Sequence, residues 1–175
     1  MKEVVLTQGF KCLVDDRDYD MVSDFKWHVL NNKKANTKYA VRMETVSINP
    51  HIQKTIFMHR VIMGVTDPKT CVDHINGDGL DNTRSNLRLS NKSQNGANRK
   101  PKKGGSSKYL GVCKMETVFN GKYYVKLKKP WHAQIRENGK IHNLGRYSKE
   151  EDAAMAYNEA AKKYHGEFAR LNILT

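Results

Sequence analysis

Cysteine, long apolar runs and acidic side chains are all scarce in this chain of 175 residues. Its 3 cysteines, Cys12, Cys71 and Cys113, are odd in number and far apart. This spacing argues against a disulfide scaffold and against Cys-x-x-Cys zinc sites, so we expect reduced, buried thiols. No apolar run approaches the roughly 18 residues of a membrane span, and the first residues lack the apolar core of a signal peptide. We therefore expect a cytoplasmic protein that does not enter a membrane.

The shortage of acidic residues is concentrated in one block. The chain holds 31 Lys and Arg against 18 Asp and Glu, for a formal net charge of +13. Residues 90–149 alone hold 15 Lys and Arg against 2 Asp and Glu, whereas the segments on either side are close to neutral. A basic block of this size is typical of proteins that bind a polyanion. A solvated lysine-rich surface is the alternative interpretation.

The densest pattern of polar side chains lies in residues 71–95. A short apolar run ends there on Asp73 and His74. The Gly- and Asn-rich residues 76–79 follow, and this composition is typical of a turn. The pattern predicts a strand that leads directly into a polar loop.

The second half of this segment predicts a strand and then a helix. Residues 86–89 alternate polar and apolar side chains, as a strand does. Asn91, with Gln94 three residues later, predicts a helix start with reciprocal capping hydrogen bonds. Asn95 would then lie in the first or second turn of that helix.

This strand–loop–strand–helix order resembles the ββα-metal core of HNH nucleases. The resemblance is specific, because Asp-His-x-Asn-Gly, Leu-Asp-Asn and Ser-Asn-Leu-Arg follow one another at short spacing. It implies that His74 is the general base, Asp73 the adjacent metal ligand and Asn86 the residue that holds the loop. Asn95 takes the last position in place of His, a variant common in phage and intron-encoded HNH homing endonucleases. The resemblance therefore implies a DNA endonuclease of a bacterial or phage-infected cell.

These residue types suit phosphodiester hydrolysis. Neutral imidazole can take a proton from water near pH 7. A hard cation accepts carboxylate and amide oxygens, so Asp73 and Asn95 are predicted to hold Mg²⁺, with Mn²⁺ as an alternative. Because neighbours on a strand point to opposite faces, the strand must end or bulge for Asp73 and His74 to serve one site. The alternative is that the motif is only a hydrophilic hairpin turn.

Residues 1–57 are predicted to be rich in β-structure, because short apolar or alternating runs are separated by polar turn residues. The predicted strands are Val4–Leu6, Phe10–Val14, Lys26–Leu30, Tyr39–Met43 and Lys54–Phe57. The acidic run Asp15–Asp20 lacks the Gly and the distal Glu of an EF-hand loop. A solvated turn is predicted there instead.

A short helix is predicted over Met58–Met63, ending at Gly64. It contains His59 and Arg60, which match a His-Arg pair that precedes the core in the related nucleases. His59 is interpreted as a structural side chain, with contact to a phosphate as the alternative. Arg60 is predicted to contact the DNA backbone.

After Asn98 the composition changes to Gly, Ser and Lys. Pro101 cannot continue a helix, and Gly/Ser pairs suit a flexible linker, so residues 99–107 are predicted to connect two domains. The cations of this linker are predicted to act as a basic arm on DNA. They are Arg99, Lys100, Lys102 and Lys103.

The remaining residues predict a small sheet and one helix. Strands are predicted over residues 109–112, 131–136 and 144–147. A Lys- and Tyr-rich insertion, residues 116–130, is predicted to form a hairpin through Asn120-Gly121.

The helix of this second part is predicted from its caps and its spacing. Ser148 and Glu151 match a capping box, and Gly166 suits the C-terminal cap. Alanines and tyrosines recur between them at helical spacing, which predicts a helix packed closely on the sheet.

This order resembles an AP2 domain. The resemblance is carried by Tyr-x-Gly-Val, Trp-x-Ala-x-Ile-Arg, Leu-Gly-x-Tyr and an alanine-rich helix followed by Gly-x-x-Ala-x-Leu-Asn. It implies a sheet that lies in the DNA major groove with the helix behind it. Residues predicted to contact DNA are Lys114, Trp131, Gln134, Arg136, Lys140 and Arg146. Plant-type sequence specificity is not expected, because Leu110, Cys113, Ile141 and Asn143 depart from the plant pattern.

The sequence therefore predicts an α+β protein with two domains. Residues 1–98 would form a β-rich segment and a ββα-metal HNH core (58–98), and residues 108–175 an AP2-like three-stranded antiparallel sheet packed on one helix. The predicted function is homing-type, metal-dependent cleavage of double-stranded DNA by a monomer without an obligatory protein partner. A non-catalytic DNA-binding regulator with a relic nuclease core is the main alternative. An RNA binder is weaker, because the stacking motifs of the common RNA modules are absent.

Overall fold

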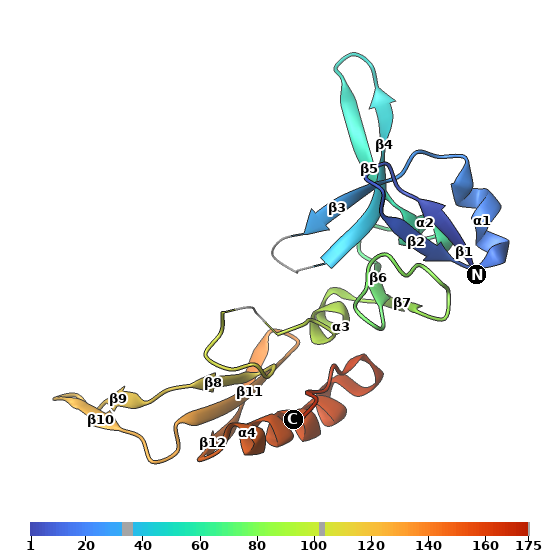
Figure 1. Cartoon of the computed structure of the whole chain (residues 1–175). Helices are drawn as coiled ribbons and strands as arrows, with labels where there is room; N and C mark the ends of the chain where they lie inside the picture. Colours follow the sequence, from blue (N-terminus) through green and yellow to red (C-terminus); the bar gives the residue numbers. More distant parts are fainter. Residues whose placement is uncertain (33–36, 102–103, 175) are drawn as a thin grey trace. The chain divides into compact units, whose positions relative to one another are not determined.

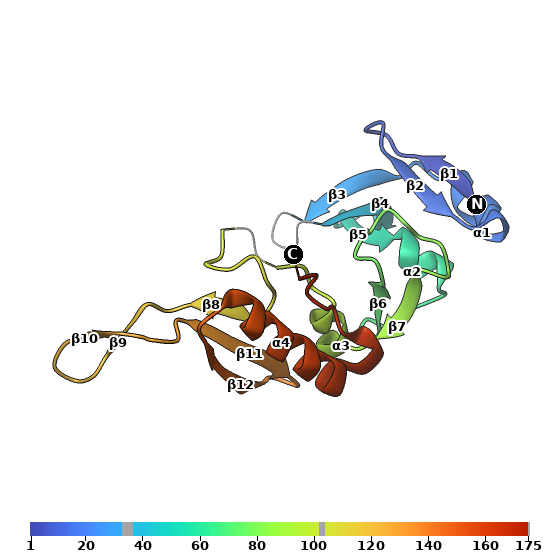
Figure 2. The ribbon, with the colours of Figure 1, turned by 60° about the horizontal axis from the view of Figure 1, so that its bottom comes forward.

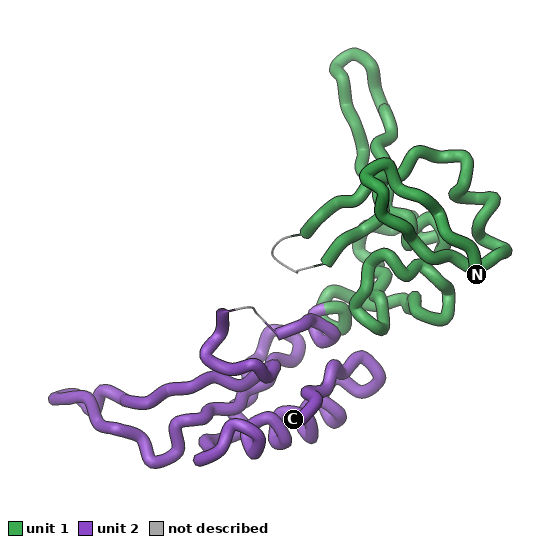
Figure 3. Tube along the Cα trace, in the orientation of Figure 1, with its two compact units in different colours: residues 1–95 green, residues 96–175 purple. Residues whose placement is uncertain are grey.

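The computed structural model describes residues 1–32, 37–101 and 104–174, and it contains helices and several small sheets (Figure 1; Figure 2). This confirms the predicted mixture of α and β structure. The chain divides into two compact units, Met1–Asn95 and Gly96–Thr175 (Figure 3). Within the described ranges, no helix has the length and apolar character needed to span a bilayer.

The first unit begins with a hairpin and a helix. Strand β1 (Lys2–Val5) pairs antiparallel with β2 (Lys11–Val14), and helix α1 (Asp16–Ser23) follows. Alternation along β2 places Cys12 and Val14 in the interior, where both side chains are fully buried. This hairpin therefore forms one side of the hydrophobic core of the first unit.

A three-stranded antiparallel sheet with the order β3-β4-β5 comes next. Its strands are β3 (His28–Asn32), β4 (Thr37–Ser47) and β5 (Ile52–Phe57). Helix α2 (Met58–Ile62) follows directly, as predicted, and Gly64 adopts a φ of 65° just beyond its end. This left-handed conformation is one that Gly accepts without strain.

The first unit ends with the hairpin of β6 (Cys71–His74) and β7 (Leu87–Ser90) and with the start of helix α3 (Lys92–Ala97), whose last two residues belong to the second unit. The predicted capping box is confirmed at α3. The backbone N–H of Asn91 donates to Gln94 Oε1, and that of Gln94 donates to Asn91 Oδ1, both at 2.9 Å.

One core joins the N-terminal segment to this hairpin. Buried side chains from β1, β2, α1, α2, β6 and β7 pack together around Trp27, whose indole N–H donates to the Val22 carbonyl at 2.7 Å. Residues 1–57 are thus part of the hydrophobic core on which β6 and β7 rest. Removing them would expose that core.

The prediction of a solvated turn over Asp15–Asp20 is wrong, because this run forms most of α1. Asp18 is 2% exposed, and its carboxylate accepts two hydrogen bonds of 2.8 Å from the Arg84 guanidinium. Asp15 Oδ2 accepts the backbone N–H of Arg84, also at 2.8 Å. These acidic residues hold a loop that lies 66 positions further along the chain. The prediction failed because the local spacing of polar and apolar residues does not show that Asp15 and Asp18 pair with the distant Arg84.

The second unit is built on the antiparallel sheet β12-β11-β8 and one long helix. The elements are β8 (Val112–Lys114), β11 (Trp131–Glu137), β12 (Lys140–Tyr147), α4 (Glu150–His165) and the 3₁₀ turn η1 (Gly166–Phe168). Ala153, Ala154 and Ala161 on α4 are fully buried. Small side chains at these positions let the helix lie close to the sheet.

The predicted capping box at Ser148 is wrong. Helix α4 begins one residue later than this box requires, with Lys149 at the N-cap and no side-chain capping bond. Glu150 instead accepts the Ser107 hydroxyl at 2.6 Å. A similar long-range clamp closes the C-terminal end, where Asn172 Oδ1 accepts the Leu110 N–H at 2.7 Å.

The insertion predicted between the first two strands forms a two-stranded ribbon. Strand β9 (Thr117–Phe119) pairs antiparallel with β10 (Tyr124–Lys126), and Asn120 Oδ1 accepts the N–H groups of Lys122 and Tyr123 at 3.0 Å each. Figure 1 and Figure 2 both show this ribbon projecting from the sheet of its unit. The predicted hairpin through Asn120-Gly121 is confirmed.

Replacing Arg84 by Ala should lower the free energy of unfolding by about 3 kcal/mol, because it leaves the buried Asp18 carboxylate unpaired. Urea unfolding at pH 7 measures the change. Arg17→Ala is the matched control. Arg17 reaches the same carboxylate only at 4.0 Å and is 71% exposed, so its loss should stay within about 0.5 kcal/mol. Equal effects of the two variants would contradict the assignment.

Candidate active site

The end of strand β6 is where the polar motif begins. The strand terminates at His74, as the sequence required, and its pairing with β7 shows no bulge. Asp73 stands opposite Arg88 and His74 opposite Leu87. The two motif side chains therefore leave the last two positions of one strand, toward its two faces.

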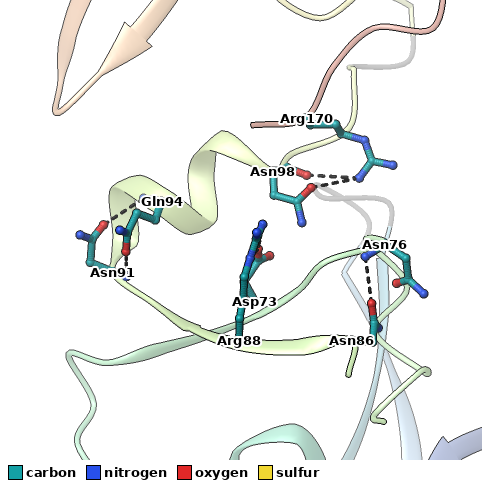
Figure 4. A network of polar contacts seen from close by, with 8 residues as sticks. All are labelled: Asp73, Asn76, Asn86, Arg88, Asn91, Gln94, Asn98 and Arg170. Carbon is teal, nitrogen blue, oxygen red and sulfur yellow. Dashed lines mark hydrogen bonds and ion pairs between the residues drawn. The ribbon is translucent and has the colours of Figure 1, made fainter. Parts of the chain in front are cut away.

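Asn86 fastens the loop that follows. Its Oδ1 accepts the Asn76 N–H at 2.9 Å, and its Nδ2 donates to the Asp81 carbonyl at 2.8 Å. Its own carbonyl accepts the Ile75 N–H at 2.9 Å. Figure 4 shows Asn86 lying against Asn76 at the base of this loop. The side chain thus ties both ends of the loop together.

The carboxylate of Asp73 is held by Arg88 on the neighbouring strand. Asp73 is 5% exposed, and its Oδ2 accepts hydrogen bonds from Arg88 Nε at 2.9 Å and Nη2 at 2.7 Å (Figure 4). Charge-assisted bonds of this kind fix both partners. The Asp73 carboxylate is therefore buried, held in one orientation and already paired with the positively charged Arg88 guanidinium.

His74 is oriented by a buried amide that the sequence motif did not reveal. His74 Nε2 lies 3.1 Å from Oδ1 of Asn82, a residue with no exposed surface. Asn82 Nδ2 donates to Cys12 Sγ at 2.7 Å, so its oxygen is the atom turned toward the ring. A carbonyl oxygen can only accept. The proton of neutral His74 therefore resides on Nε2, and Nδ1 carries the lone pair.

The surroundings of His74 disfavour its charged form. The ring is 4% exposed and packs against His59, with centroids 4.9 Å apart, and against Tyr39, at 5.9 Å. Burial lowers the pKa of His74, although the Asn82 hydrogen bond and the nearby Asp73 act in the opposite direction. The imidazole is thus neutral at pH 7 and able to take a proton.

His59 and Arg60 serve the fold. Burial, with the nearby His74 and Arg60, lowers the pKa of His59 to about 3, so the ring packs as a neutral group. The Arg60 guanidinium donates to the carbonyls of Thr70 and Asp67 at 2.7 Å each. The structural interpretation of His59 agrees with its burial. The two Arg60 bonds hold the turn before β6, and the DNA contact of Arg60 stays a prediction.

The comparisons with known proteins agree with this geometry. The family model described as HNH endonuclease matches residues 57–97, which include β6, β7 and α3. An uncharacterized HNH endonuclease of Acanthamoeba polyphaga mimivirus is 30% identical over 154 residues, covering 88% of this chain and 70% of the viral protein. The chain belongs to the HNH endonuclease family. No solved structure matches it.

Membership in this family makes the protein a nuclease that acts on DNA, and it argues against a purely regulatory role. Asp73 and His74 occupy the last two positions of β6 and Asn86 directly precedes β7, whereas Asn95 lies exposed on α3. Sequence reasoning missed Asn82 and Arg88. The quoted motifs contained both residues, but only long-range contacts show what they do.

HNH endonucleases generally use a divalent metal ion, and the oxygen donors of this endonuclease suit one. Among the residues that the structure describes, no group of three or more His, Cys, Asp and Glu could hold a metal ion. The Asp73 carboxylate nevertheless offers the kind of oxygen that a hard cation prefers, and water and phosphate oxygens can supply further ligands. Because Arg88 already engages Asp73, the ion should bind weakly until the phosphate of DNA is present.

In the second unit of the endonuclease, one face of the sheet is polar. Ala133 and Ile135 are buried beneath α4, so strand alternation turns the side chains between and beyond them to the opposite face. This outward face is formed by Cys113, His132, Gln134, Arg136, Ile141, Asn143 and Arg146. The His132 ring lies between the two neighbouring strands on this face. Its Nε2 is 3.1 Å from Asn143 Oδ1 on β12, and its Nδ1 is 3.7 Å from Cys113 Sγ on β8.

The residues predicted to contact DNA do not all lie on the same face of this sheet. Gln134, Arg136 and Arg146 lie on the outward face, and Lys140 is exposed at the adjacent hairpin. Trp131 instead packs against the core under α4. Its predicted DNA contact is corrected to a packing role, because alternation gives it the same direction as Ala133. Lys114 pairs with Glu116 at 2.6 Å and lies over the Trp131 ring.

The predicted basic arm is described in part. Arg99 and Lys100 are exposed, whereas Lys102 and Lys103 lie outside the described residues. Sequence reasoning did not select His132 and Asn143 as surface residues, although alternation with Gln134 and Arg136 would have indicated the orientation of His132.

Neutral His74 should be found as the Nε2–H tautomer in ¹⁵N-histidine NMR spectra at pH 7, because Asn82 accepts that proton. Asn82→Leu keeps the size of the side chain but removes the acceptor, so the ring should become a mixture of tautomers. Asn31→Leu alters an exposed Asn on β3, outside this loop, and should leave the His74 signals unchanged. An Nδ1–H tautomer in the wild-type protein would contradict the hydrogen-bond assignment.

Proposed function

We propose that this endonuclease hydrolyses phosphodiester bonds of double-stranded DNA with His74 as the general base. The observation that carries the proposal is the buried Asn82 hydrogen bond, which holds the imidazole as one neutral tautomer. A general base must be neutral and must aim its lone pair in a fixed direction. His74 Nδ1 would take the proton of the attacking water.

Asp73 and Asn95 are proposed to hold Mg²⁺, with Mn²⁺ as the alternative. A bound divalent ion would stabilise the charge that develops on the scissile phosphate and the leaving 3′ oxygen. Arg88 would orient the Asp73 carboxylate toward that position, and Asn86 would keep the loop beside it closed. Asn95 would contribute its amide oxygen from α3.

The second unit is proposed to direct the nuclease to DNA as an AP2-like domain. The support is a polar outward face that carries Gln134, Arg136 and Arg146, together with the charge of residues 90–149. Arg136 and Gln134 would contact base edges in the major groove. Lys140 and the linker of residues 99–107 would contact phosphates. This combination supports a homing-type endonuclease, which we propose to work as a monomer.

His74→Ala should reduce cleavage of supercoiled plasmid in Mg²⁺ by about 10²–10⁴-fold, the usual contribution of a general base. Binding to DNA in EDTA should remain close to that of the wild type. His51→Ala, at an exposed position between β4 and β5, is the matched control and should cleave normally. Near wild-type cleavage by His74→Ala would rule out this role.

Removal of the metal ion provides the second control for the same assay. EDTA should stop cleavage by the wild type, and added Mg²⁺ should restore it. Asp73→Asn keeps a group that can accept from Arg88 but removes the negative charge, so it should require more Mg²⁺. Cleavage that continues in EDTA would sink the metal-dependent mechanism.

Arg136→Ala and Lys140→Ala should weaken DNA binding in different ways. A base contact by Arg136 predicts a loss of about 1–3 kcal/mol that is confined to the cognate site. A phosphate contact by Lys140 predicts an equal loss on all sequences, with the log–log salt slope reduced by about 1. Anisotropy titrations with cognate and scrambled duplexes over a salt series measure both quantities. Losses of the same pattern in both variants would contradict these roles.

A further inference from the structure

The ribbon of β9 and β10 is a surface that the proposed cleavage of DNA does not use. Every residue from Lys114 to Lys126 is exposed. The ribbon continues the pairing of β8 and β11, since the Met115 N–H donates to the Pro130 carbonyl and the Leu127 N–H to the Glu116 carbonyl, both at 2.8 Å. An isolated two-stranded hairpin is marginal in water, so this attachment to the sheet gives it its support.

One face of the ribbon carries an aromatic pair. Phe119 and Tyr124 stand directly opposite each other in the register, so their side chains share a face. Their ring centroids are 5.4 Å apart, and the two residues are 56% and 74% exposed. Large aromatic side chains held in place yet open to solvent are typical of a binding surface.

The same face also carries positive charge. Lys126 lies two residues beyond Tyr124 on the same strand, so its side chain points to the same face about 7 Å away. Residues 117–130 include Lys122, Lys126, Lys128 and Lys129 and no Asp or Glu. Glu116, directly before β9, pairs with Lys114 and lies within electrostatic reach of Lys126, but the lysines of residues 114–130 outnumber it five to one. Aromatic faces beside this excess of lysines complement a polymer that alternates flat rings with phosphates.

We propose that this face of the ribbon binds single-stranded DNA, with unpaired bases stacked on Phe119 and Tyr124 and the adjacent phosphate paired with Lys126. Stacking on aromatic side chains and a positively charged track are the two components of single-strand binding. Duplex DNA fits the aromatic pair less well, because its base faces are covered by the neighbouring pairs. The site lies outside the catalytic residues, so its occupation requires neither His74 nor a metal ion.

The test uses the full-length protein in EDTA, which separates binding from cleavage. Fluorescence anisotropy measures its affinity for a labelled oligothymidylate, which cannot pair with itself, and for a duplex of the same length. The double variant Phe119→Leu/Tyr124→Leu should bind the oligothymidylate at least about tenfold more weakly, with unchanged affinity for the duplex. Tyr124→Phe keeps a stacking ring and should bind the oligothymidylate as the wild type does.

A matched control lies on the opposite face of the same ribbon. Val118 and Val125 are paired across the strands and are 40% and 38% exposed, so Val118→Ala/Val125→Ala removes apolar surface without touching the aromatic pair. This variant should keep its affinity for the oligothymidylate. Lys126→Ala should weaken that binding and reduce its log–log salt slope by about 0.7.

Two outcomes would overturn the proposal. The leucine double variant could bind the oligothymidylate as tightly as the wild type, or it could lose affinity for single strand and duplex by the same factor. The second result would make the ribbon a general contact to DNA. Plasmid cleavage in Mg²⁺ reports separately on the His74 mechanism, so the failure of one proposal is distinguishable from the failure of the other.

Discussion

The buried amide of Asn82 connects the catalytic motif to the rest of the nuclease unit. Its oxygen fixes the tautomer of His74, and its nitrogen is bound to the thiol of Cys12 on β2. Burial raises the pKa of Cys12 to about 11, so the sulfur remains an uncharged acceptor. The backbone N–H of Asn82 also donates to the Leu13 carbonyl at 2.8 Å. The direction of the His74 ring therefore depends on the N-terminal hairpin.

The acidic helix α1 extends this support to the far end of the loop between β6 and β7. Arg84 follows Asn82 by two residues and is held by Asp15, Asp18 and the Ile62 carbonyl. In a flexible loop the Asn82 oxygen would not keep its hydrogen bond to His74, because such a bond requires a narrow range of distance and angle. Residues 1–57 supply that rigidity, so they belong to the active unit even though none of them is proposed to touch the substrate.

The two faces of the sheet in the second unit differ, because one packs against α4 and the other is polar and faces outward. Ala133, Ile135 and Trp131 face α4, while Gln134, Arg136 and His132 face outward. The alanines of α4 bring the helix close to the sheet, and the other face of the sheet carries the side chains proposed to contact DNA. The ribbon of β9 and β10 adds a second exposed surface with different chemistry. Its aromatic rings suit the faces of bases, whereas the polar side chains of the sheet suit their edges.

The sequence by itself determined the order of the elements around the motif, the capping of α3, the hairpin at Asn120-Gly121 and the location of the positive charge. Each of these follows from neighbouring residues, whose periodicity or capping chemistry acts locally. Only the tertiary structure decided which buried partners orient the site. Asn82 meets Cys12 across 70 positions and Arg84 meets Asp18 across 66. Such pairs depend on how the core packs, so an acidic run that resembled a turn became the helix that holds the loop between β6 and β7.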